Sequence, residues 1–475
     1  MAGFHIEHFG CRAARADGEA MAGNLRAMSA LEPFANDVVV VNTCSVTAEA
    51  DRAARAFIRR AHRQNPAAKI VVTGCYAQRA PNELAAMAGV AAVVGNSHKA
   101  LAPEIILNLT RESERGVART VSRPPALVPV AQLLAASGPS APIWAPIWVD
   151  DRFAHSFIED VHWGETQPAA GAQTRPNLKI QEGCGNRCTF CVIPFTRGPS
   201  QSLPHAVVMR QVESFVAAGG KELVLSGINL GRWGRDFEGS SRETLPGLVR
   251  SILERTGLPR LRLSSIEPMD WDDELIALMR EFGGKRLARH AHLPLQSGSD
   301  AVLRRMHRRY RPWHYAGKVG ELLRAAGPDL TLGADVMVGF PGETDGEFEE
   351  TLAFIRALPF GYLHLFPFSA RPGTRAWALH EASPVPQAAT QERMAALRAL
   401  AAEKSGTHRR RFVGREFEAI TLHTPAALAR RGSTTALTEN FLPVELEGSF
   451  AANHLLRIRV TGLNAEGAIR ASATA

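Results

Sequence analysis

The sequence lacks the features that would place it in a membrane or in a secretory pathway. No uninterrupted apolar run approaches the ~18 residues that a membrane-spanning helix needs. The N-terminal stretch contains no basic start followed by an apolar block and a cleavage site, so no secretory signal is visible. We therefore expect a cytoplasmic protein with no membrane partner.

Aromatic residues are few, at 7%, and charged residues reach only 21%, whereas hydrophobic residues make up 45% of the chain. This balance is typical of an ordinary globular α/β protein. A length of 475 residues predicts about two to four domains. The net charge of +8 fits a polyanionic partner such as nucleic acid, but it fits a merely soluble basic protein equally well.

Cysteine is also scarce, with six residues in the whole chain. In a reducing cytoplasm cysteines are metal ligands more often than disulfide partners. The six fall into two triads with none left over: Cys11, Cys44 and Cys75 in the first, and Cys184, Cys188 and Cys191 in the second.

The second triad lies in the stretch Lys179–Arg197 (KIQEGCGNRCTFCVIPFTR), with the spacing Cys-x-x-x-Cys-x-x-Cys. Thiolates are soft ligands that suit iron–sulfur clusters or zinc. Three are one too few to close a tetrahedral zinc site or to give each iron of a cubane a protein ligand. A cubane here would therefore keep one iron open to an outside molecule. Zinc with a distant fourth ligand such as His205, and thiols that merely pack, remain as alternatives.

Residues 1–100 alternate short apolar runs with helical patterns. This β-α-β-α-β order predicts a parallel sheet with right-handed crossovers. The expected strands are Phe4–Gly10, Asp37–Thr43 and Lys69–Gly74, and the expected helices are Arg15–Ala30 and Ala48–Asn65. Each strand is followed by a cysteine, and the carboxyl ends of parallel strands share one edge. We therefore expect the first triad to converge and to hold a second cluster; the alternative is three buried cysteines that pack as small hydrophobes.

Residues 101–176 are rich in proline, alanine and serine, which predicts a linker. From Asn177 to about Gly373 a strand-then-helix rhythm recurs six times. The expected strands are Leu178–Gln181, Glu222–Ser226, Arg260–Ser265, His290–Pro294, Thr331–Val338 and Tyr362–Phe366. The expected helices include Leu245–Arg255, Asp272–Glu281 and Thr344–Leu358. Repeated βα units predict a partial barrel whose chemistry lies at the carboxyl ends of its strands.

That edge should also carry several polar, glycine-rich turns, which indicate a nucleoside-sized ligand although each turn alone is weak evidence. The turns are Ser226–Gly231, Ser264–Pro268, Gln296–Gly298, Gly333–Gly342 and Ser369–Gly373.

After a helical stretch, Gln387–Lys404, the sequence pattern changes from helical to strand-like. The segments Glu416–His423, Phe441–Leu446 and Leu455–Val460 read as short strands separated by turns, which predicts a small β-barrel. The basic run His408–Arg411 either contacts phosphates or forms a solvated face. The expected domains are therefore 1–100, a linker over 101–176, a core over 177–404 and a β domain over 405–475.

The central loop, Cys-x-x-x-Cys-x-aromatic-Cys with Phe190 in the aromatic place, resembles the signature of radical S-adenosylmethionine (SAM) enzymes. The two triads, the core and the C-terminal β domain together resemble the methylthiotransferase family over nearly the whole chain. The segments Leu293–Ser299, Val338–Glu343 and Ser369–Thr374 also look like motifs of that family.

This resemblance implies a SAM-binding [4Fe–4S] cluster on Cys184, Cys188 and Cys191, which we expect to be catalytic, and an auxiliary [4Fe–4S] cluster on Cys11, Cys44 and Cys75. It further implies a TRAM-like C-terminal domain that grips RNA, tRNA as partner, and an electron donor such as flavodoxin or ferredoxin. The residues expected to contact SAM are Phe190, Gly227, Asn229, Ser265, Glu267, Gln296, Asp335, Gly339 and Arg371, the last of which could instead face a substrate phosphate.

Four segments resemble the family branch that acts on threonylcarbamoyladenosine beside the anticodon: Asn42–Thr47, Arg197–Ser200, Ser264–Pro268 and Thr438–Asn440. The expected reaction is methylthiolation of adenine C2, with two SAM molecules and a cluster-bound sulfur. The alternatives are the isopentenyladenosine branch, the branch that modifies a ribosomal-protein aspartate, and a non-catalytic RNA-binding iron–sulfur sensor. The chain departs from the family pattern at Ala14, Gly18, Leu203 and Phe368, which puts the surroundings of the auxiliary cluster in question.

Overall fold

The computed structural model describes residues 3–31, 34, 37–112, 145–158, 163, 174–238 and 243–474. The chain forms two compact units. Unit 1 consists of Met1–His162 together with the short segment Phe195–Arg197, and unit 2 consists of Trp163–Pro194 and Gly198–Ala475. Among the residues described, no helix is both long and apolar enough to span a membrane.

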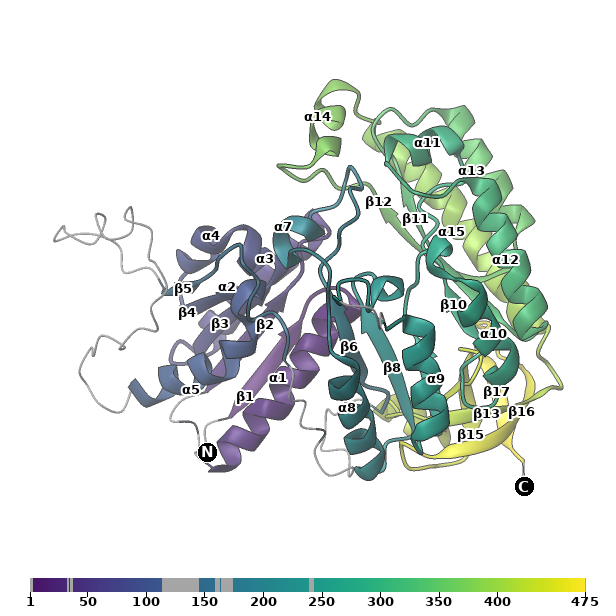
Figure 1. Cartoon of the computed structure of the whole chain (residues 1–475), viewed down its shortest axis with the longest axis horizontal. Helices are drawn as coiled ribbons and strands as arrows, with labels where there is room; N and C mark the ends of the chain where they lie inside the picture. Colours follow the sequence, from purple (N-terminus) through teal and green to yellow (C-terminus); the bar gives the residue numbers. More distant parts are fainter. Residues whose placement is uncertain are drawn as a thin grey trace. The chain divides into compact units, whose positions relative to one another are not determined.

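Unit 1 is built on a five-stranded parallel sheet (Figure 1), in the order β1 (Phe4–His8), β2 (Val38–Thr43), β3 (Lys69–Gly74), β4 (Val90–Gly95), β5 (Ile147–Trp148). The first three strands lie where the sequence predicted them. Strands β4 and β5 were not predicted, because β4 is an alanine-containing run without alternation and β5 has only two residues.

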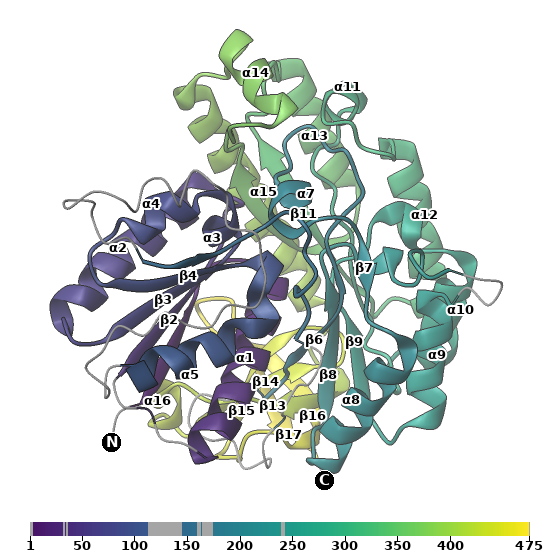
Figure 2. The same ribbon diagram turned by 60° about the vertical axis from the view of Figure 1, so that its left-hand side comes forward.

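Helices cover both faces of this sheet (Figure 2). They are α1 (Arg12–Leu31), α2 (Ala48–Gln64), α3 (Cys75–Arg79), α4 (Pro81–Ala85), the 3-10 helix η1 (Asn96–Leu101) and α5 (Ala102–Glu112). Helix α5 and strand β5 fall inside the stretch 101–176 for which the sequence predicted a linker, and both belong to unit 1. Much of that stretch, residues 113–144, 159–162 and 164–173, lies outside the described residues.

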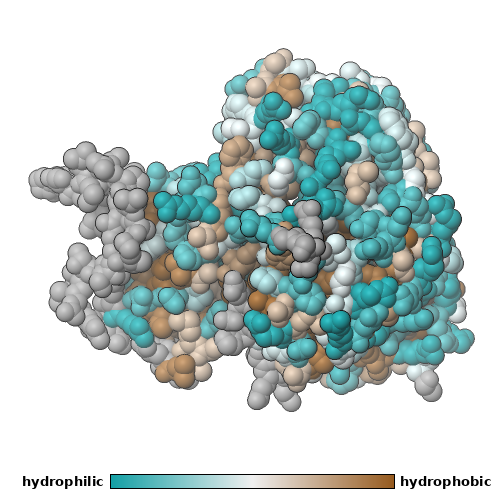
Figure 3. Space-filling view, viewed as in Figure 1, coloured by the Kyte–Doolittle hydropathy of each residue, from teal (hydrophilic) through white to brown (hydrophobic). Residues whose placement is uncertain are grey.

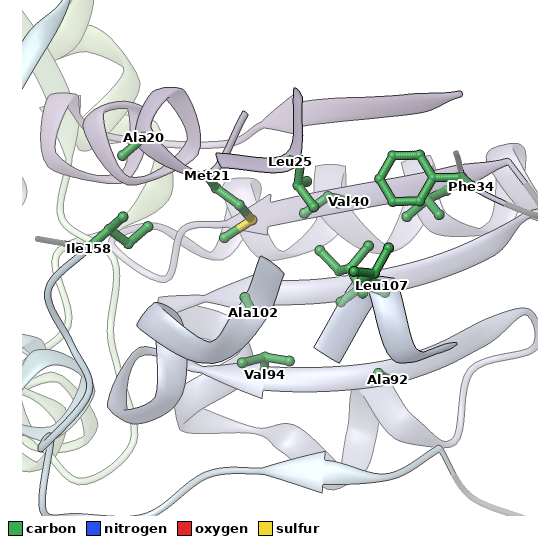
Figure 4. Packing of buried hydrophobic residues seen from close by; sticks show 13 residues of the cluster. Ala20, Met21, Leu25, Phe34, Val40, Ala92, Val94, Ala102, Leu107 and Ile158 are labelled. Atoms are coloured by element: carbon green, nitrogen blue, oxygen red, sulfur yellow. The ribbon is translucent and has the colours of Figure 1, made fainter. Parts of the chain in front are cut away.

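Alternation along the strands explains the two-sided burial. Val38 and Val40 of β2 pack in one core with Met21 and Leu25 of α1 and with Leu107 of α5 (Figure 4). The intervening residues Val39 and Val41 pack on the opposite face with residues of α2, α3 and α4. A strand buried on both faces reads as a continuous apolar run, as DVVVVNT does.

The core of unit 2 contains six parallel strands. Strands β6 (Asn177–Glu182), β8 (Glu222–Gly227) and β9 (Arg260–Leu263) form one sheet, which the short antiparallel β7 (Gln201–Ser202) extends; β10 (His290–His292), β11 (Thr331–Val338) and β12 (Phe360–Pro367) form the other. Backbone hydrogen bonds link the two sheets, from Ala288 N to Leu261 O at 2.9 Å and from Ile266 N to His292 O at 3.1 Å. All six predicted strands are present, in an open array rather than a closed ring.

The longer helices between these strands and after the last one are α8 (His205–Ala217), α9 (Leu245–Arg255), α10 (Asp273–Phe282), α12 (Pro312–Ala326), α13 (Asp345–Ala357) and α15 (Gln387–Arg410). The surface over α10 and α12 is mainly hydrophilic in the view of Figure 3, as expected for helices with one face in the core. Helix α15 extends beyond its predicted end at Lys404, so His408, Arg409 and Arg410 of the basic run lie in its last turn and Arg411 follows as the C-cap. His408 is buried, its Nε2 lies 2.9 Å from the Thr331 hydroxyl, and burial lowers the pKa of His408 to about 4.

Unit 2 ends in a closed five-stranded barrel in the order β13-β14-β15-β17-β16. The strands are β13 (Glu416–Thr421), β14 (Ser433–Thr438), β15 (Pro443–Glu447), β16 (Leu455–Leu463) and β17 (Ile469–Ala473). Strands β14 (STTALT) and β17 (IRASA) were not predicted, because small and polar residues give little strand signal. The predicted fold class is confirmed: an N-terminal parallel α/β domain, a partial (βα)6 barrel and a small C-terminal β-barrel.

Candidate active site: two thiol triads

The second triad occupies the loop between β6 and α7 (Ile193–Arg197). All three thiols are partly exposed. Each sulfur accepts a hydrogen bond: Cys184 from Asn186 N at 3.4 Å, Cys191 from Ile193 N at 3.5 Å, and Cys188 from Arg308 Nη1 at 3.2 Å. Donors aimed at every sulfur favour thiolates over thiols, which is the state in which cysteine binds a metal.

Burial acts in the opposite direction on these thiols. It raises the pKa of Cys191 to about 12 and also raises the pKa of Cys184. Binding of a metal must therefore displace protons from the site. Three converging soft donors with hydrogen-bonded sulfurs fit an iron–sulfur cluster with one open iron. His205, considered as a fourth zinc ligand, begins α8 and has its Nδ1 4.0 Å from a Glu243 carboxylate oxygen.

A cavity of about 390 Å³ opens beside Cys188. Its lining is strongly basic and consists of Gly185, Asn186, Arg187, Cys188, Arg232, Glu267, His307, Arg308 and Arg309. Glu267 accepts two hydrogen bonds from Arg308 Nη2, at 2.7 and 2.5 Å, and one-fifth of its side chain is exposed. Arg308 was not predicted; its position after a Met-His dipeptide gives no sequence signal.

Asn229 lies beside the first thiol of this triad. Its Nδ2 is 3.7 Å from Cys184 Sγ, and its backbone N donates to Gln181 Oε1 at 2.7 Å. The Asn229 Oδ1 atom is buried and accepts no hydrogen bond from the described part of the chain. An amide oxygen held in this way can accept a hydrogen bond from an ammonium group.

The predicted ligand contacts Ser265 and Asp335 belong to one polar group that the sequence did not reveal. Ser265 Oγ lies 2.5 Å from His292 Nδ1, and Asp335 Oδ1 lies 3.2 Å from His364 Nδ1 and 3.4 Å from His292 Nε2. Burial disfavours the charge, but hydrogen bonds from both imidazoles hold the pKa of Asp335 well below its usual range. The ligand atoms of His292, Asp335 and His364 all lie within 4.8 Å of one another.

Gln296 joins the same region through its backbone N, which donates to Asp335 O at 2.7 Å, and its φ of 67° marks a constrained turn. The other expected SAM contacts have packing roles of their own. A Cβ on Gly227 would lie 2.9 Å from Gln181 Cβ, and one on Gly339 would lie 2.7 Å from Thr390 Oγ1. Phe190 packs edge-on against Phe340.

Arg371 is buried, and its carbonyl accepts hydrogen bonds from the backbone N and the hydroxyl of Thr374. Of the nine expected contacts, only Glu267 lines the cavity beside Cys188. The roles of all nine therefore stay predictions.

The first triad is assembled from three strand ends. Cys11, Cys44 and Cys75 each follow one of the adjacent parallel strands β1, β2 and β3. Burial, together with the charges of Cys11 and Cys75, raises the pKa of Cys44 to about 12. Gly10 has a φ of 119°, and a Cβ there would lie 2.7 Å from Cys44 Sγ, so only glycine fits this close approach.

Two buried residues that were not predicted as site residues donate to Cys75, and three further buried residues hold them in place. Its sulfur accepts hydrogen bonds from Asn96 Nδ2 at 3.4 Å and from Arg197 Nε at 3.2 Å. Asn96 Nδ2 also donates to Thr196 O at 2.7 Å. Arg197 Nη1 lies 3.2 Å from Asp17 Oδ2, and Lys99 forms a second ion pair with Asp17. Asn96 follows β4, the strand that the sequence analysis missed, and Arg197 ends the cysteine-rich stretch.

Of the four departures from the family pattern, the structure explains Gly18 by lack of space and does not explain the other three, whose contacts are nevertheless defined. A Cβ on Gly18 would lie 1.9 Å from His8 Cε1, so His8 occupies the space that a larger residue would need. Ala14 is buried, and its carbonyl accepts a hydrogen bond from Asn42. Leu203 is buried beneath Trp233, whose Nε1 donates to its carbonyl, and Phe368 packs against Phe340.

Two family descriptions match the chain, "Uncharacterized protein family UPF0004" over residues 3–95 and "Radical SAM superfamily" over residues 178–355. The chain is 35% identical over 416 residues to the threonylcarbamoyladenosine tRNA methylthiotransferase MtaB of Bacillus subtilis (strain 168), covering 87% of this chain and 82% of the relative. It is 32% identical to the enzyme of the same name from Thermotoga maritima, covering 98% and 95%. It is also 35% identical to a tRNA-2-methylthio-N(6)-dimethylallyladenosine synthase of Cereibacter sphaeroides, covering 86% and 85%.

Proposed function

The chain belongs to the radical SAM methylthiotransferase family, and we propose that it modifies tRNA by methylthiolating adenine C2 of threonylcarbamoyladenosine beside the anticodon. Its cofactors are SAM and [4Fe–4S] clusters. The observation that carries the proposal is the pairing of two three-thiol sites in one chain, each a cysteine short of a complete cluster ligand set. A single radical SAM site would need only the central loop.

The chemistry of the product explains why acid–base catalysis is insufficient. The C2–H of adenine has no acidic proton for a side-chain base to remove. A [4Fe–4S] cluster with an open iron supplies the electron transfer that starts radical chemistry, while the protein positions the reactants and excludes water. The product carries a methylthio group in place of a hydrogen, so the reaction needs a sulfur atom, a methyl donor and a group that removes the hydrogen. When bound, SAM would supply the methyl group and the radical that removes the hydrogen, and the sulfur would come from a separate donor.

Within this proposal Cys184, Cys188 and Cys191 hold the cluster that binds SAM, and the basic cavity beside Cys188 receives the SAM molecule. Asn229 Oδ1 and the partly exposed carboxylate of Glu267 are positioned to accept hydrogen bonds from the SAM ammonium group. The buried Gln296 Oε1 accepts no hydrogen bond within the described residues and is a third candidate for a ligand donor.

Cys11, Cys44 and Cys75 would hold the auxiliary cluster, which would supply a place for the sulfur that is transferred. The C-terminal barrel would contact the tRNA anticodon stem-loop. Arg430 and Arg431 are exposed between β13 and β14 and can reach phosphates there, as a sequence-independent electrostatic grip requires. The electron donor, for example a flavodoxin or ferredoxin, acts on the cluster of the central loop.

The proposal is tested with anaerobically reconstituted protein. About eight irons per chain are expected, four for each cubane. Incubation with SAM, sulfide, a reductant and tRNA should yield 5′-deoxyadenosine and a methylthio group on threonylcarbamoyladenosine, detected by mass spectrometry of nucleosides. About four irons without SAM cleavage would overturn the two-cluster enzyme and favour an iron–sulfur sensor.

A second candidate substrate is dimethylallyladenosine in tRNA, because a synthase of its methylthio derivative is as similar to this chain as the Bacillus enzyme is. Parallel reactions with tRNA carrying one or the other modified adenosine separate the two. SAM cleavage with both tRNAs left unmodified would point instead to a protein substrate such as a ribosomal-protein aspartate.

A further inference from the structure

Each thiol triad has a buried arginine that is fixed by a carboxylate and donates a hydrogen bond to a cysteine sulfur. Arg197 plays this part in unit 1, and Arg308 plays it in unit 2. Arg197 lies 122 positions from Cys75 in the sequence, and Arg308 lies 120 positions from Cys188. The same arrangement therefore arises twice by tertiary contact.

Arg197 is held by two side chains in unit 1. Its Nε donates to Cys75 Sγ at 3.2 Å, and its Nη1 lies 3.2 Å from Asp17 Oδ2. The side chains of Arg197 and Asp17 are 0% and 1% exposed. A guanidinium this deeply buried, fixed by a carboxylate, cannot turn away from the sulfur without breaking its ion pair.

Arg308 is held in the same way in unit 2. Its Nη1 donates to Cys188 Sγ at 3.2 Å, while its Nη2 makes both hydrogen bonds to the Glu267 carboxylate. Its Nε donates to the Tyr310 hydroxyl at 3.2 Å. Arginine is not deprotonated in proteins, so the Arg308 side chain is a cation.

A fixed cation at a ligating sulfur has a definite electrostatic effect. Reduction adds negative charge to an iron–sulfur cluster, and a hydrogen-bonded guanidinium stabilises the reduced form more than the oxidised form. The reduction potential of the cluster is raised as a result. Asn96 donates a hydrogen bond to Cys75, and Asn229 donates one to Cys184. These amides also favour the reduced cluster, but because they carry no charge they raise its potential less than an arginine does.

We propose that Arg197 and Arg308 each raise the reduction potential of the cluster whose cysteine sulfur they contact. This inference rests on the two-cluster assignment of the proposed function. Each arginine acts on its own cluster, so the chain sets the two potentials separately through Asp17–Arg197 and Glu267–Arg308.

The test uses full-length protein with one cluster at a time. Replacing Cys184, Cys188 and Cys191 by alanine leaves only the first triad, and replacing Cys11, Cys44 and Cys75 leaves only the second. In each background Arg197→Met and Arg308→Met are compared by an electron paramagnetic resonance redox titration. The exposed arginines Arg59 and Arg324, replaced by methionine, serve as matched controls.

Arg197→Met should lower the midpoint potential of the first cluster and leave the second unchanged, and Arg308→Met should do the reverse. Arg197→Lys and Arg308→Lys keep the positive charge but lose the planar guanidinium with its several N–H donors. Each should lower the potential less than the corresponding methionine variant does. If iron content is complete and neither potential moves beyond the controls, the inference is wrong while the proposed function stands. If the single-triad proteins bind no iron, the two-cluster assignment itself fails.

A buried arginine variant could lose its cluster by unfolding, which the iron content and the melting temperature would reveal. In that event Asn96→Leu and Asn229→Leu provide the readout, because each removes one N–H donor from a sulfur and no charge. Each should shift the potential of its own cluster downward, by less than the arginine variant. Unchanged potentials in both asparagine variants, with iron bound, would contradict the role of hydrogen bonds to these sulfurs.

Discussion

The two triads each bring three cysteine thiols together, but the chain places these thiols in different ways. Cys184, Cys188 and Cys191 come from one short loop after β6, whereas Cys11, Cys44 and Cys75 come from the ends of three strands. The first route needs only a local turn. The second needs the parallel order β1-β2-β3, so that three separate strand ends meet at one edge. A cluster site can therefore be encoded either in a motif or in a topology.

The triads also differ in how completely the carboxylates that hold their arginines are shielded from solvent. Asp17, which fixes Arg197, is 1% exposed, whereas Glu267, which fixes Arg308, keeps one-fifth of its side chain exposed to the cavity. The site in unit 1 is closed around its charges. The site in unit 2 borders the cavity beside Cys188, which Glu267 lines.

The largest expected effect comes from removing one thiol of either triad. Cys188→Ala should abolish both SAM cleavage and methylthiolation, because the open iron is lost with its cluster. Cys75→Ala should abolish methylthiolation but leave reductive cleavage of SAM to 5′-deoxyadenosine. Either variant should bind about four irons per chain instead of about eight. Loss of SAM cleavage in both variants would show that the two sites do not act separately.

The difference in shielding predicts different stability losses for the two carboxylates. Asp17→Asn leaves Lys99 and Arg197 buried without this partner, which costs about 3–5 kcal/mol of unfolding free energy. Glu267→Gln removes a charged hydrogen bond at a partly exposed site and should cost about 1.5–3 kcal/mol. Denaturant unfolding of the apo proteins measures both, with the exposed Asp151→Asn as control. Equal losses would contradict the contrast between a closed and an open site.

A buried carboxylate remote from the thiols separates fold stability from site chemistry. Burial disfavours ionisation of Glu222, but Arg262, Arg175 and Arg260 lower its pKa from 4.5 to about 2. A depressed pKa means that this stabilisation, about 3 kcal/mol, is present above pH 4.5 and is lost as the pH falls toward 2.

The stability difference between wild type and Glu222→Gln should accordingly be largest above pH 4.5 and shrink on acidification. Unfolding curves recorded across that pH range measure it. The single-cluster potentials should not change in this variant, in contrast to Arg197→Met and Arg308→Met. A stability difference between wild type and Glu222→Gln that does not depend on pH would show that the carboxylate is not charged in the native state.

The smallest effect is expected at the helix that follows Cys44. Thr47 caps α2, and its hydroxyl accepts a hydrogen bond from Ala50 N at 3.2 Å; Thr344 caps α13 in unit 2 in the same way. Replacing either threonine by alanine should cost about 1 kcal/mol, measured by thermal unfolding. Thr47→Ala should retain full iron loading. Loss of the first cluster in this variant would mean that the strand-end site depends on the helix cap as well as on the sheet.

Strand prediction succeeded where apolar residues repeat with a clear pattern and failed where they do not. All six core strands and the first three strands of unit 1 were predicted, β2, β3 and β11 from β-branched runs and the others from short apolar segments in the recurring strand-then-helix order. Strands β14 and β17 are small and polar in composition, and they are strands because they complete a closed barrel. Their hydrogen-bonding partners supply what their own sequence lacks.

The sequence by itself determined the six thiols, their division into triads and the order of the strands that carry them, because each of these depends on local spacing or local pattern. It did not determine which side chains surround the sulfurs. Arg197 and Arg308 lie 122 and 120 positions from the cysteines that they contact, so no local spacing shows that they donate to sulfur. The tertiary structure alone decided that a carboxylate-held cation faces each triad, because such a contact is made by the packing of distant elements.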